Sequence, residues 1–506
     1  MARLPNVGGD DGNWGTLLND FLSVEHNTDG TLKRGGDIDT AQSTANAKYT
    51  KPGTGIPLSD LAAAVQTRVN GAVQHGEHVI YAIDHGALFD GSTDDAAALQ
   101  AAINAAVTAS KPLLLPPGTA VIGTPLSISA TVTILGSGRE ETVLKAKNGL
   151  NDYVIKFTGG SVGVGIVGAH FADFAIDGNS ANQTAGGAIL GDGAVQCSFE
   201  RLHVYSIYNW GLKLGPITGG AFGHHNRVMS CLFDNSGASV GFGGGIWATS
   251  SDENWYVATD FEYLGGATSP VSVGQPPVML YDQAGLQHII GCNFVSGSNG
   301  CMAIRIQNAL KTKVVGCTFD GVPGDNVFLS ANKCIITSNI FTHPGDAGPA
   351  AASGIHLEFN THFNIVSGNS LETSDGAGET RSLIREESTG GGGDNIIEGN
   401  STTWGGVAPT ISLIESAGTN TIVRNNIGWS TEKVGTATVA NGATSVAVAH
   451  GLESAPALAN ISVTPTNNLG NAAKFWISGV TNTQFTLNVD VDPGANTATF
   501  VWNARM

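Results

Sequence analysis

Charged residues are rare in this sequence. Only 13% of its 506 residues are Asp, Glu, Lys or Arg, and the formal net charge is -18. A chain so poor in positive charge is a weak match for the phosphate backbone of a nucleic acid. The same balance disfavours broad attraction to a strongly anionic polymer, and it leaves room only for a local basic site.

Long apolar runs are missing as well. The first residues, MARLPNVGGDDGNWG, contain no apolar core of the kind that defines a signal peptide, and no uninterrupted apolar run reaches the length of a membrane span. We therefore expect a soluble protein without a membrane partner. Any export would use a route that this sequence does not encode.

The cysteines form neither a disulfide framework nor a metal motif. No C-x-x-C spacing occurs, and at least three of the six cysteines share one position of a repeat that is described below. We therefore expect buried free thiols. The six residues are Cys197, Cys231, Cys292, Cys301, Cys317 and Cys334.

Glycine and short β-branched phrases are abundant instead. The chain has 69 glycines, a composition typical of many short strands and tight turns. Between residues 226 and 426 one phrase returns: two or three aliphatic residues, then Cys, Thr or Asn, then often Phe two positions on. Copies lie 22 to 33 residues apart. The Cys, Thr or Asn position is occupied by Cys231, Thr259, Cys292, Cys317, Asn339, Asn369, Asn400 and Asn426.

An irregular period of this length indicates a stacked β-solenoid. Strands of four to six residues are too short to bury a face alone, but the next coil pairs their backbone groups and turns the aliphatic and Phe positions into internal ladders. Cys suits such an interior as a small apolar group. Asn suits it because its amide can hydrogen-bond to its copies at a turn.

Two regions flank the predicted solenoid of residues 76–430. Residues 1–75 contain two short amphipathic helices by spacing, at 14–25 and 61–69, and form an attachment or trimerisation region joined by a linker. Residues 431–506 contain six alternating strands, which predict a β-sandwich. The sandwich either caps the solenoid, clamps a trimer or binds carbohydrate.

The start of the solenoid carries a compact motif. Gly86-Ala87 precedes Asp90-Gly-Ser-Thr-Asp-Asp95, an alanine-rich helix follows at 96–109, and Leu115-Pro-Pro-Gly-Thr119 comes next. Asp94 is a suitable N-cap for that helix, which would cover the open end of the solenoid. This opening resembles that of the pectate-lyase-like, glycoside-hydrolase-28-related right-handed β-helix superfamily, over roughly residues 78 to 430.

The resemblance implies an all-β fold, a right-handed parallel β-helix with an N-terminal capping helix. It also implies a homotrimer that acts on a polysaccharide, outside the cell or on a virion, as tailspikes and depolymerases do. Members hydrolyse or eliminate glycosidic bonds, and some only bind glycan. No cofactor is implied, and a divalent cation such as calcium stays open. The polygalacturonase pattern of Asn-x-Asp, Asp-Asp, Gly-His-Gly and Arg-Ile-Lys is not met, which argues against that activity.

The densest group of acidic residues lies in the middle of the solenoid. Hydrolysis requires two facing carboxylates, whereas elimination requires a base and a cation, and basic residues are few here. Asp260 and Glu262 flank Phe261 with period two, so we expect both carboxylates to point outward. The predicted catalytic residues are Asp260, Glu262, Asp252, Glu253 and Asp282.

Aromatic residues next to these acids suggest platforms for sugar rings. The predicted substrate-binding residues are Trp255, Tyr256, Tyr263, Tyr281 and, two or more coils away, Glu358. The loop 264–279 would wall the cleft. The alternative is structural: Asp252 and Asn254 as turn residues, and the other acids as solvated surface charge.

We therefore favour glycosidic hydrolysis of a polysaccharide. The alternatives are a polysaccharide lyase and a non-catalytic glycan-binding protein of the tail-fibre type.

Overall fold

The computed structural model describes residues 27, 40–41, 43–44 and 78–506, apart from 159–164, 216–222, 235–243, 265–277, 298–299, 346–351, 374–379, 388–391, 404–410 and 417. Contacts divide the chain into Met1–Glu77 and His78–Met506. The helices predicted at 14–25 and 61–69, and most of the predicted cleft wall at 264–279, lie outside the described residues. The division into three domains stays a prediction.

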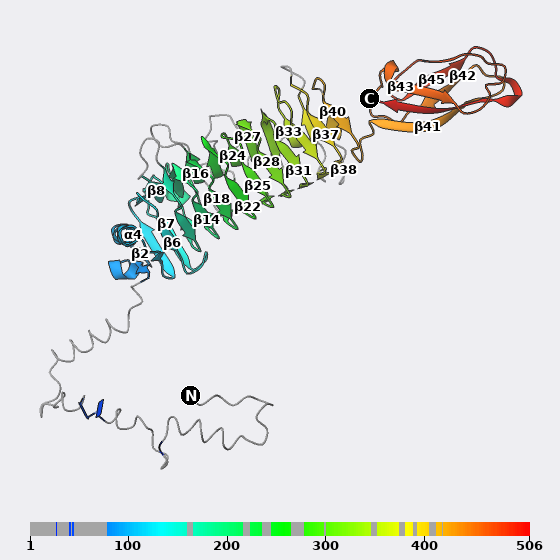
Figure 1. Ribbon diagram of the computed structural model, residues 1–506. Coiled ribbons are helices and arrows are strands. Elements are labelled where there is room, and N and C mark those ends of the chain that lie inside the picture. The colour runs from blue at the N-terminus through cyan, green and yellow to red at the C-terminus, as the bar shows by residue number, and fades with distance from the viewer. Residues whose placement is uncertain are drawn as a thin grey trace. The chain divides into compact units, whose positions relative to one another are not determined.

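Between Ile80 and Arg424 the chain winds through successive coils, and its short parallel strands stack into long sheets (Figure 1). Because each coil pairs with the next in register, the backbone hydrogen bonds run along the stack. The fold is the predicted right-handed parallel β-helix, and the fold class is confirmed.

Among the residues that the structure describes, the β-helix has four parallel sheets. Sheet 1 consists of β1 (Ile80–Tyr81), β3 (Leu113–Leu114), β6 (Thr133–Leu135), β10 (His170–Ala172), β14 (Ser198–Glu200), β18 (Arg227–Met229), β22 (Trp255–Val257), β25 (His288–Ile290), β28 (Lys313–Val315), β31 (Ile335–Thr337), β34 (Ile365–Ser367), β37 (Ile396–Glu398) and β40 (Ile422–Arg424). Sheet 2 consists of β2 (Asp90–Asp94), β4 (Gly118–Ile122), β7 (Thr142–Ala146), β11 (Ala175–Asp177), β15 (His203–Tyr205), β19 (Leu232–Asp234), β23 (Asp260–Glu262), β26 (Asn293–Val295), β29 (Thr318–Asp320), β32 (Ile340–Thr342), β35 (Ser370–Glu372) and β38 (Ser401–Thr403). Sheet 3 consists of β5 (Leu126–Ile128), β8 (Ile155–Phe157), β12 (Ile189–Asp192), β16 (Trp210–Gly215), β20 (Gly244–Ala248), β24 (Val278–Asp282), β27 (Met302–Leu310), β30 (Val327–Asn332), β33 (Ala352–Leu357), β36 (Thr380–Glu386) and β39 (Ile414–Glu415). Sheet 4 is a short one, of β9 (Ile166–Val167), β13 (Ala194–Val195), β17 (Gly223–His224) and β21 (Ser251–Asp252).

The recurring Phe position forms a continuous stack inside sheet 2. The rings of Phe233, Phe261, Phe294, Phe319 and Phe341 lie nearly parallel, with centroids 4.5 to 5.4 Å apart. This distance follows the strand spacing of about 4.8 Å, so the backbone repeat itself sets the stacking. The predicted internal ladder is confirmed.

The Asn position forms a second ladder, at the corner between sheets 1 and 2. Each amide nitrogen donates to the amide oxygen of the next coil: Asn339 to Asn369 at 2.9 Å, Asn369 to Asn400 at 2.9 Å and Asn400 to Asn426 at 3.0 Å. The residue before each Asn has a positive φ, as at Ser338 and at Gly368. The ladder therefore satisfies backbone groups that the sharp corner leaves unpaired.

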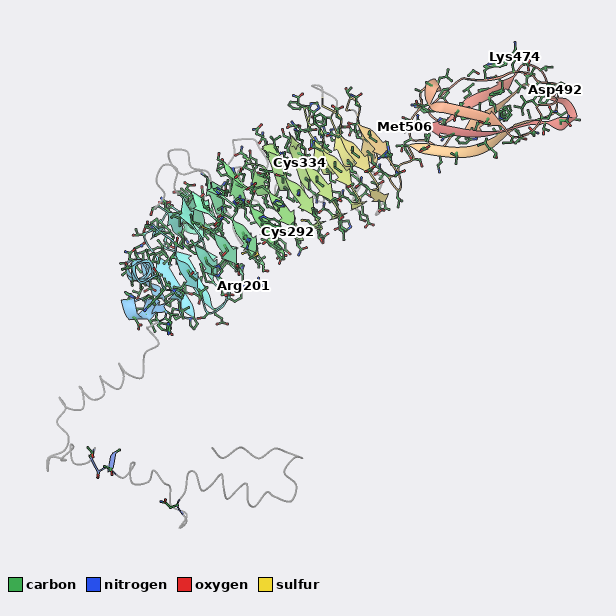
Figure 2. The ribbon with its side chains drawn as sticks, in the orientation of Figure 1. Arg201, Cys292, Cys334, Lys474, Asp492 and Met506 are labelled. Carbon is green, nitrogen blue, oxygen red and sulfur yellow. The ribbon has the colours of Figure 1, made fainter. Side chains whose placement is uncertain are left out.

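The cysteines are free and buried, as predicted. Cys231 and Cys292 occupy the corner of the Asn ladder, whereas Cys334 lies at the corner before sheet 1. Figure 2 labels Cys292 and Cys334. Burial raises the pKa of the Cys231 thiol to about 12, so the thiol stays protonated and unreactive near neutral pH.

The helix α4 (Ala96–Ala109) covers the first coils. Its N-cap is Asp95, and Asp94 contributes by accepting the Ala96 amide at 3.2 Å, so the predicted cap is shifted by one residue. The buried Asp95 carboxylate instead accepts the Leu88 and Phe89 amides, at 2.8 and 3.0 Å. The opening motif therefore ties the segment before β2 to the N-terminus of the helix.

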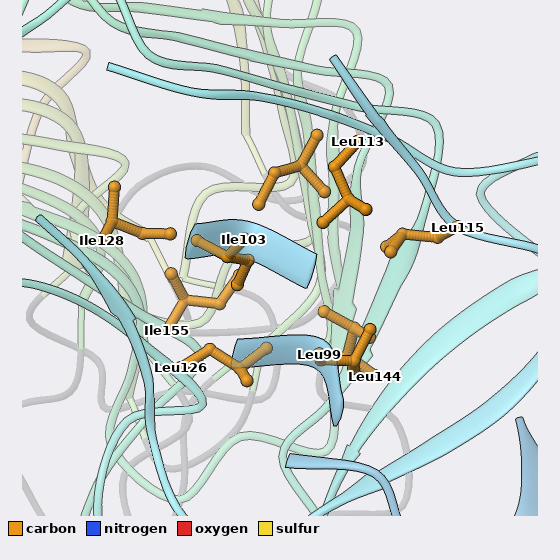
Figure 3. Close-up of a pocket in the computed structure, with 9 residues that line it drawn as sticks. Leu99, Ile103, Leu113, Leu115, Leu126, Ile128, Leu144 and Ile155 are labelled. Atoms are coloured by element: carbon orange, nitrogen blue, oxygen red, sulfur yellow. The ribbon is translucent and has the colours of Figure 1, made fainter. Parts of the chain in front are cut away.

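An apolar contact holds this cap in place (Figure 3). Only a cavity of about 10 Å³ remains between the helix and the first coils, room for about one water molecule, and its lining has no polar group to hold one. The lining residues are Leu99, Ile103, Leu113, Leu115, Leu126, Ile128, Ile134, Leu144 and Ile155.

Beyond the β-helix, all six predicted strands form. They make two antiparallel three-stranded sheets: sheet 5, in the order β41 (Glu432–Val439), β46 (Ala498–Arg505) and β43 (Ile461–Pro465), and sheet 6, in the order β42 (Ser445–Ala449), β45 (Gln484–Val489) and β44 (Phe475–Ser478). Four short 3-10 helices complete the described elements: η2 (Ala82–His85), η3 (Ser180–Asn182), η4 (Leu458–Asn460) and η5 (Gly494–Asn496). The sheets enclose a core that is separate from that of the β-helix.

We expect Leu99→Ala to lower the free energy of unfolding of the β-helix by about 2–5 kcal/mol, because it enlarges a cavity that cannot hold water. Urea unfolding followed by circular dichroism measures the loss. Ala101→Ser, on the exposed side of the same helix, is the matched control and should cost less than about 1 kcal/mol. Equal losses would show that the cap does not depend on this contact.

We expect Asn369→Ala to cost at least about 2 kcal/mol, because it leaves the Ile336 carbonyl and the Asn339 donors without their partner. Ser370→Ala changes the next, outward-facing residue and should change stability by less than about 0.5 kcal/mol. A loss at Asn369 no larger than that of the control would contradict a stabilising role for the ladder.

Candidate functional site

The predicted acidic pair lies on sheet 2. Asp260 and Glu262 flank the buried Phe261 on β23, and both are partly exposed, so the expected alternation is correct. The Asp260 carboxylate accepts the Asn293 amide at 2.7 Å. Glu262 stands directly beside Asp234 of the previous coil. Asp234, Asp260 and Glu262 therefore contribute to a polar surface of sheet 2.

The other predicted acids lie elsewhere on the coil. Asp252 belongs to sheet 4, and Glu253 is in the corner after it, with φ of 54° and an ion pair to His225. Asp282 is fully buried. Its carboxylate accepts the Ala284 and Gly285 amides, both at 2.9 Å, and burial raises its pKa. Asp282 therefore cannot touch a substrate as the predicted catalytic residue, because it closes a turn inside the coil.

The predicted aromatic platforms are also separated. Trp255 is 40% exposed, but it lies on sheet 1 and stacks on His288 with ring centroids 4.2 Å apart. Tyr263 is exposed at the turn after β23. Tyr256 points into the core, and Tyr281 is buried beside Trp210 on the outer side of sheet 3. Neither ring is exposed to solvent, so the prediction that both are sugar platforms is wrong.

The reason for this separation is the shape of the coil. Strands of three residues are followed by sharp corners, so residues eight positions apart lie on different sheets. Of the predicted residues, Tyr281, Asp282 and Glu358 lie on or directly after strands of sheet 3, and Glu358 is partly buried. The predicted residues therefore do not form one site.

Sheet 3 carries a line of polar and aromatic side chains instead. In each strand, one residue lies directly opposite the corresponding residue of the next coil and is outside the apolar core, whereas the residue before it belongs to that core. In the first three strands this position is occupied by Ser127, Lys156 and Leu190. From β16 onward we call this line of residues the outer row. Its members, in order along the stack, are Lys213, Trp247, Tyr281, Arg305, Phe328, His356, Arg385 and Glu415.

His356 is the centre of a chain of hydrogen bonds within the outer row. Its Nδ1 lies 2.8 Å from Asp325 Oδ2, and its Nε2 lies 3.2 Å from Glu387 Oε1. Glu387 also accepts from Arg385, and Asp325 accepts the Ser353 amide at 2.7 Å. The His356 side chain is 7% exposed and that of Glu387 is 22% exposed, so Glu387 is the accessible end of the chain.

A second ion pair follows on the next coil. Arg381 binds Glu415 in a two-pronged contact, with distances of 3.0 and 2.8 Å, and the Ser382 hydroxyl donates to the same carboxylate at 3.2 Å. The Arg381 guanidinium lowers the pKa of Glu415 below its usual value. Glu415 is thereby held as a carboxylate and is not suited to act as an acid.

The earlier half of the outer row is aromatic. The Lys213 ammonium lies 4.5 Å from the ring centre of Trp247, and the Trp247 indole donates to Gln283 at 2.9 Å. The Arg305 guanidinium lies 5.5 Å from the ring of Tyr281 and 5.3 Å from that of Phe328. Alternating cations and rings stabilise one another, and they form a continuous strip beside the His356 cluster.

A sequence signal for the outer row exists. Each member is the middle residue of a triplet whose first residue is aliphatic, as in Ile304-Arg305-Ile306, Ile355-His356-Leu357 and Ile384-Arg385-Glu386. Alignment of the middle residues predicts that they lie side by side, but this signal is weaker than the corner repeat of the Cys and Asn residues. Among the described residues, no cluster of three or more His, Cys, Asp or Glu side chains is arranged to hold a metal ion.

Comparison with known families identifies the start of the β-helix. Residues 80–171 match the family model of rhamnogalacturonase A/epimerase, pectate lyase-like. The resemblance that the opening motif indicated is confirmed for this segment. No curated protein matches the chain.

Several solved structures are similar in fold. The A-module of the mannuronan C-5 epimerase AlgE6 from Azotobacter vinelandii is 20% identical over 69% of this chain and 98% of its own, with a TM-score of 0.48. The tailspike protein gp49 from Pseudomonas phage LKA1 is 12% identical over 84% and 99%, with a TM-score of 0.44. ORF18 of Geobacillus virus E2 is 15% identical over 86% and 81%, with a TM-score of 0.46. Likenesses of this degree assign neither a reaction nor site residues to this chain.

The ion pair of Arg381 and Glu415 predicts a pH-dependent stability. A carboxyl whose pKa is lowered by folding stabilises the fold above its unfolded pKa of about 4.3 and loses that contribution as pH falls through the folded value. We expect Arg381→Gln to lower stability by at most about 1 kcal/mol at neutral pH, since the pair is partly exposed. The difference from the unchanged protein should shrink below about pH 4.

Melting temperatures measured between pH 3 and 7 check this expectation. Arg424→Gln breaks the more exposed pair with Glu398 and serves as the control, with a smaller effect. A difference that does not vary with pH would contradict the electrostatic origin.

Proposed function

We propose that this chain binds a polysaccharide beside the His356 cluster of sheet 3, at the partly exposed side chains of Arg381, Arg385, Glu387 and Glu415, and cleaves it there by acid–base chemistry. The observation that carries this proposal is the chain of hydrogen bonds from Asp325 through His356 to Glu387, which ends at an accessible carboxylate. The match of residues 80–171 to a pectate-lyase-like family supports a polysaccharide as the substrate. That match ends before the cluster, so the reaction rests on the cluster alone.

Glu387 is the group that we assign to proton transfer. It is the most exposed member of the set that includes His356 and Asp325, so a bound sugar can touch it. Both ring nitrogens of His356 lie within hydrogen-bond distance of a carboxylate oxygen. Asp325 thus positions His356, and His356 positions Glu387, as a base is oriented by a third group in other enzymes.

Two partly exposed arginines make an acidic sugar the substrate that we propose. Arg381 and Arg385 lie on one strand of sheet 3, among the carboxylates of Asp325, Glu358, Glu386, Glu387 and Glu415. A guanidinium at this position can pair with the carboxylate of a uronate. We accordingly place β-elimination first. Glu387 takes the C5 proton next to the uronate carboxylate, while an arginine stabilises the charge that develops on that carboxylate. The C4–C5 double bond forms as the C4–O bond breaks, and the leaving oxygen takes a proton from water.

Hydrolysis is the second candidate, and one observation favours it. Glu387 and Glu415 are two partly exposed carboxylates on or next to adjacent strands of sheet 3. Paired carboxylates are the requirement for glycoside hydrolysis. In this case Glu415, held ionised by Arg381, is the base or nucleophile, and Glu387 has to supply the proton.

Binding without cleavage is the non-enzymatic alternative. An extracellular or virion-associated location and a homotrimer stay predictions, as does the use of a divalent cation. In the part of the chain that the structure describes, no helix is both long enough and apolar enough to cross a membrane.

We expect Glu387→Gln to reduce the cleavage rate at least about 100-fold, because it removes the proton acceptor and keeps its shape. The assay follows reducing ends and the ultraviolet absorbance of unsaturated uronate together, on a panel of uronate-containing and neutral polysaccharides. Absorbance with reducing ends identifies elimination, and reducing ends alone identify hydrolysis.

The double change Asp260→Asn/Glu262→Gln on sheet 2 is the matched control and should keep full activity. Loss of activity in that control, with Glu387→Gln unaffected, would move the site to sheet 2. Binding of a polysaccharide by the unchanged protein without any cleavage would reject the enzyme in favour of a glycan-binding protein.

A further inference from the structure

Sheet 6 presents an outer face that the packing of the C-terminal sandwich does not use. Along β45, Phe485, Leu487 and Val489 point inward and are buried in the sandwich core, so Gln484, Thr486 and Asn488 point outward. On β44 the same alternation turns Ile477 inward and Trp476 outward. The inward residues pack in the core of the sandwich, whereas the outward residues do not contribute to that packing.

Trp476 is the prominent residue of this outer face. It is 49% exposed, although a smaller polar residue would expose less apolar surface at this position. In register with it across the sheet are Asn488 and Ser445, and the next row consists of Ser478, Thr486 and Ala447. The ring therefore lies at one end of a flat polar surface that spans three strands, about 10 Å across.

The polar groups of this face are held in place. Asn488 Nδ2 donates to the Ser478 hydroxyl at 2.9 Å and to the Trp476 carbonyl at 3.3 Å. Its Oδ1 is then the part of the amide that can accept from an outside hydroxyl. The Trp476 ring and the hydrogen-bonding groups beside it are thus preorganised on a rigid sheet.

The strand residues of the face are uncharged. The outward residues of its three strands are Ser445, Ala447, Ala449, Gln484, Thr486, Asn488, Trp476 and Ser478. Lys474 and Asp492 lie beyond the strand ends (Figure 2), and Asp490 accepts the Ala473 and Lys474 amides beside Trp476. The opposite charges of Lys474 and Asp490 offset each other at this border, so a neutral polymer is not repelled.

We propose that the outer face of sheet 6 is a binding site for a neutral polysaccharide, with a sugar ring stacked on Trp476 and its hydroxyls hydrogen-bonded to Asn488, Ser478 and Thr486. A sugar ring has an apolar face and a hydroxyl rim, which match an indole surrounded by amides and hydroxyls. A second copy of the chain fits less well. Stable interfaces bury about 800 Å² per partner around an apolar centre, and this face has one large apolar side chain.

This site is independent of the reaction proposed for sheet 3. The binding of neutral sugar units by the sandwich would hold a polymer near the β-helix whichever bond is cleaved there. The two proposals therefore have separate tests, and either can fail without the other.

Affinity electrophoresis of the full chain tests the site, in native gels that contain dextran, galactan or mannan. We expect retardation by at least one of these polymers, and a dissociation constant raised at least tenfold in Trp476→Ala. Asn488→Ala should weaken binding several-fold. Val501→Ala is the matched control, because Val501 is an exposed apolar residue on sheet 5, and it should bind as the unchanged protein does.

Three outcomes would overturn the proposal. They are the absence of retardation in all three gels, equal retardation of the unchanged protein and of Trp476→Ala, and a change of oligomeric mass in Trp476→Ala, which would identify the face as an interface between copies. Near-ultraviolet circular dichroism verifies that each variant is folded. Glu387→Gln should be retarded normally, so a failure of the reaction on sheet 3 is distinguishable from a failure of this site.

Discussion

The in-register hydrogen bonding of one coil to the next determines most of this molecule. Each coil buries little by itself, and its strands of two to nine residues become stable only when the neighbouring coil supplies partners for their backbone groups. The stacking distance of about 4.8 Å then sets the side-chain contacts. The parallel rings from Phe233 to Phe341 and the amides from Asn339 to Asn426 are consequences of that one repeat.

The same constraint produces the candidate site. A residue that points outward at one position of a strand lies directly beside its copy on the next coil, so any polar residue placed there meets another. His356, Arg385 and Glu415 are neighbours for this reason, although about thirty residues separate each from the next along the chain. A flat stack of strands also offers a long surface, which suits a polymer better than a small molecule.

The stack has to be closed at its ends, since an open coil exposes apolar side chains and unpaired strand edges. Helix α4 covers the first coils with Leu99 and Ile103. The motif that precedes it serves the same purpose through Asp95, whose buried carboxylate holds the Leu88 and Phe89 amides. A motif that indicates a family is in this case explained by packing and not by catalysis.

The sequence by itself determined the coil repeat, the capping helix, the buried thiols and the six strands of the sandwich. These features depend on local alternation and on residues such as Asn369 that recur at one corner, and both are visible in a single chain. It also placed Asp260 and Glu262 correctly on the outside of their strand. What it could not determine was which outward residues share a face. Asp252, Trp255 and Asp260 are close in sequence but lie on three different sheets, because the chain turns a sharp corner between them. The contact of His356 with Asp325 and Glu387 spans about thirty residues on either side and exists only once the coils are stacked.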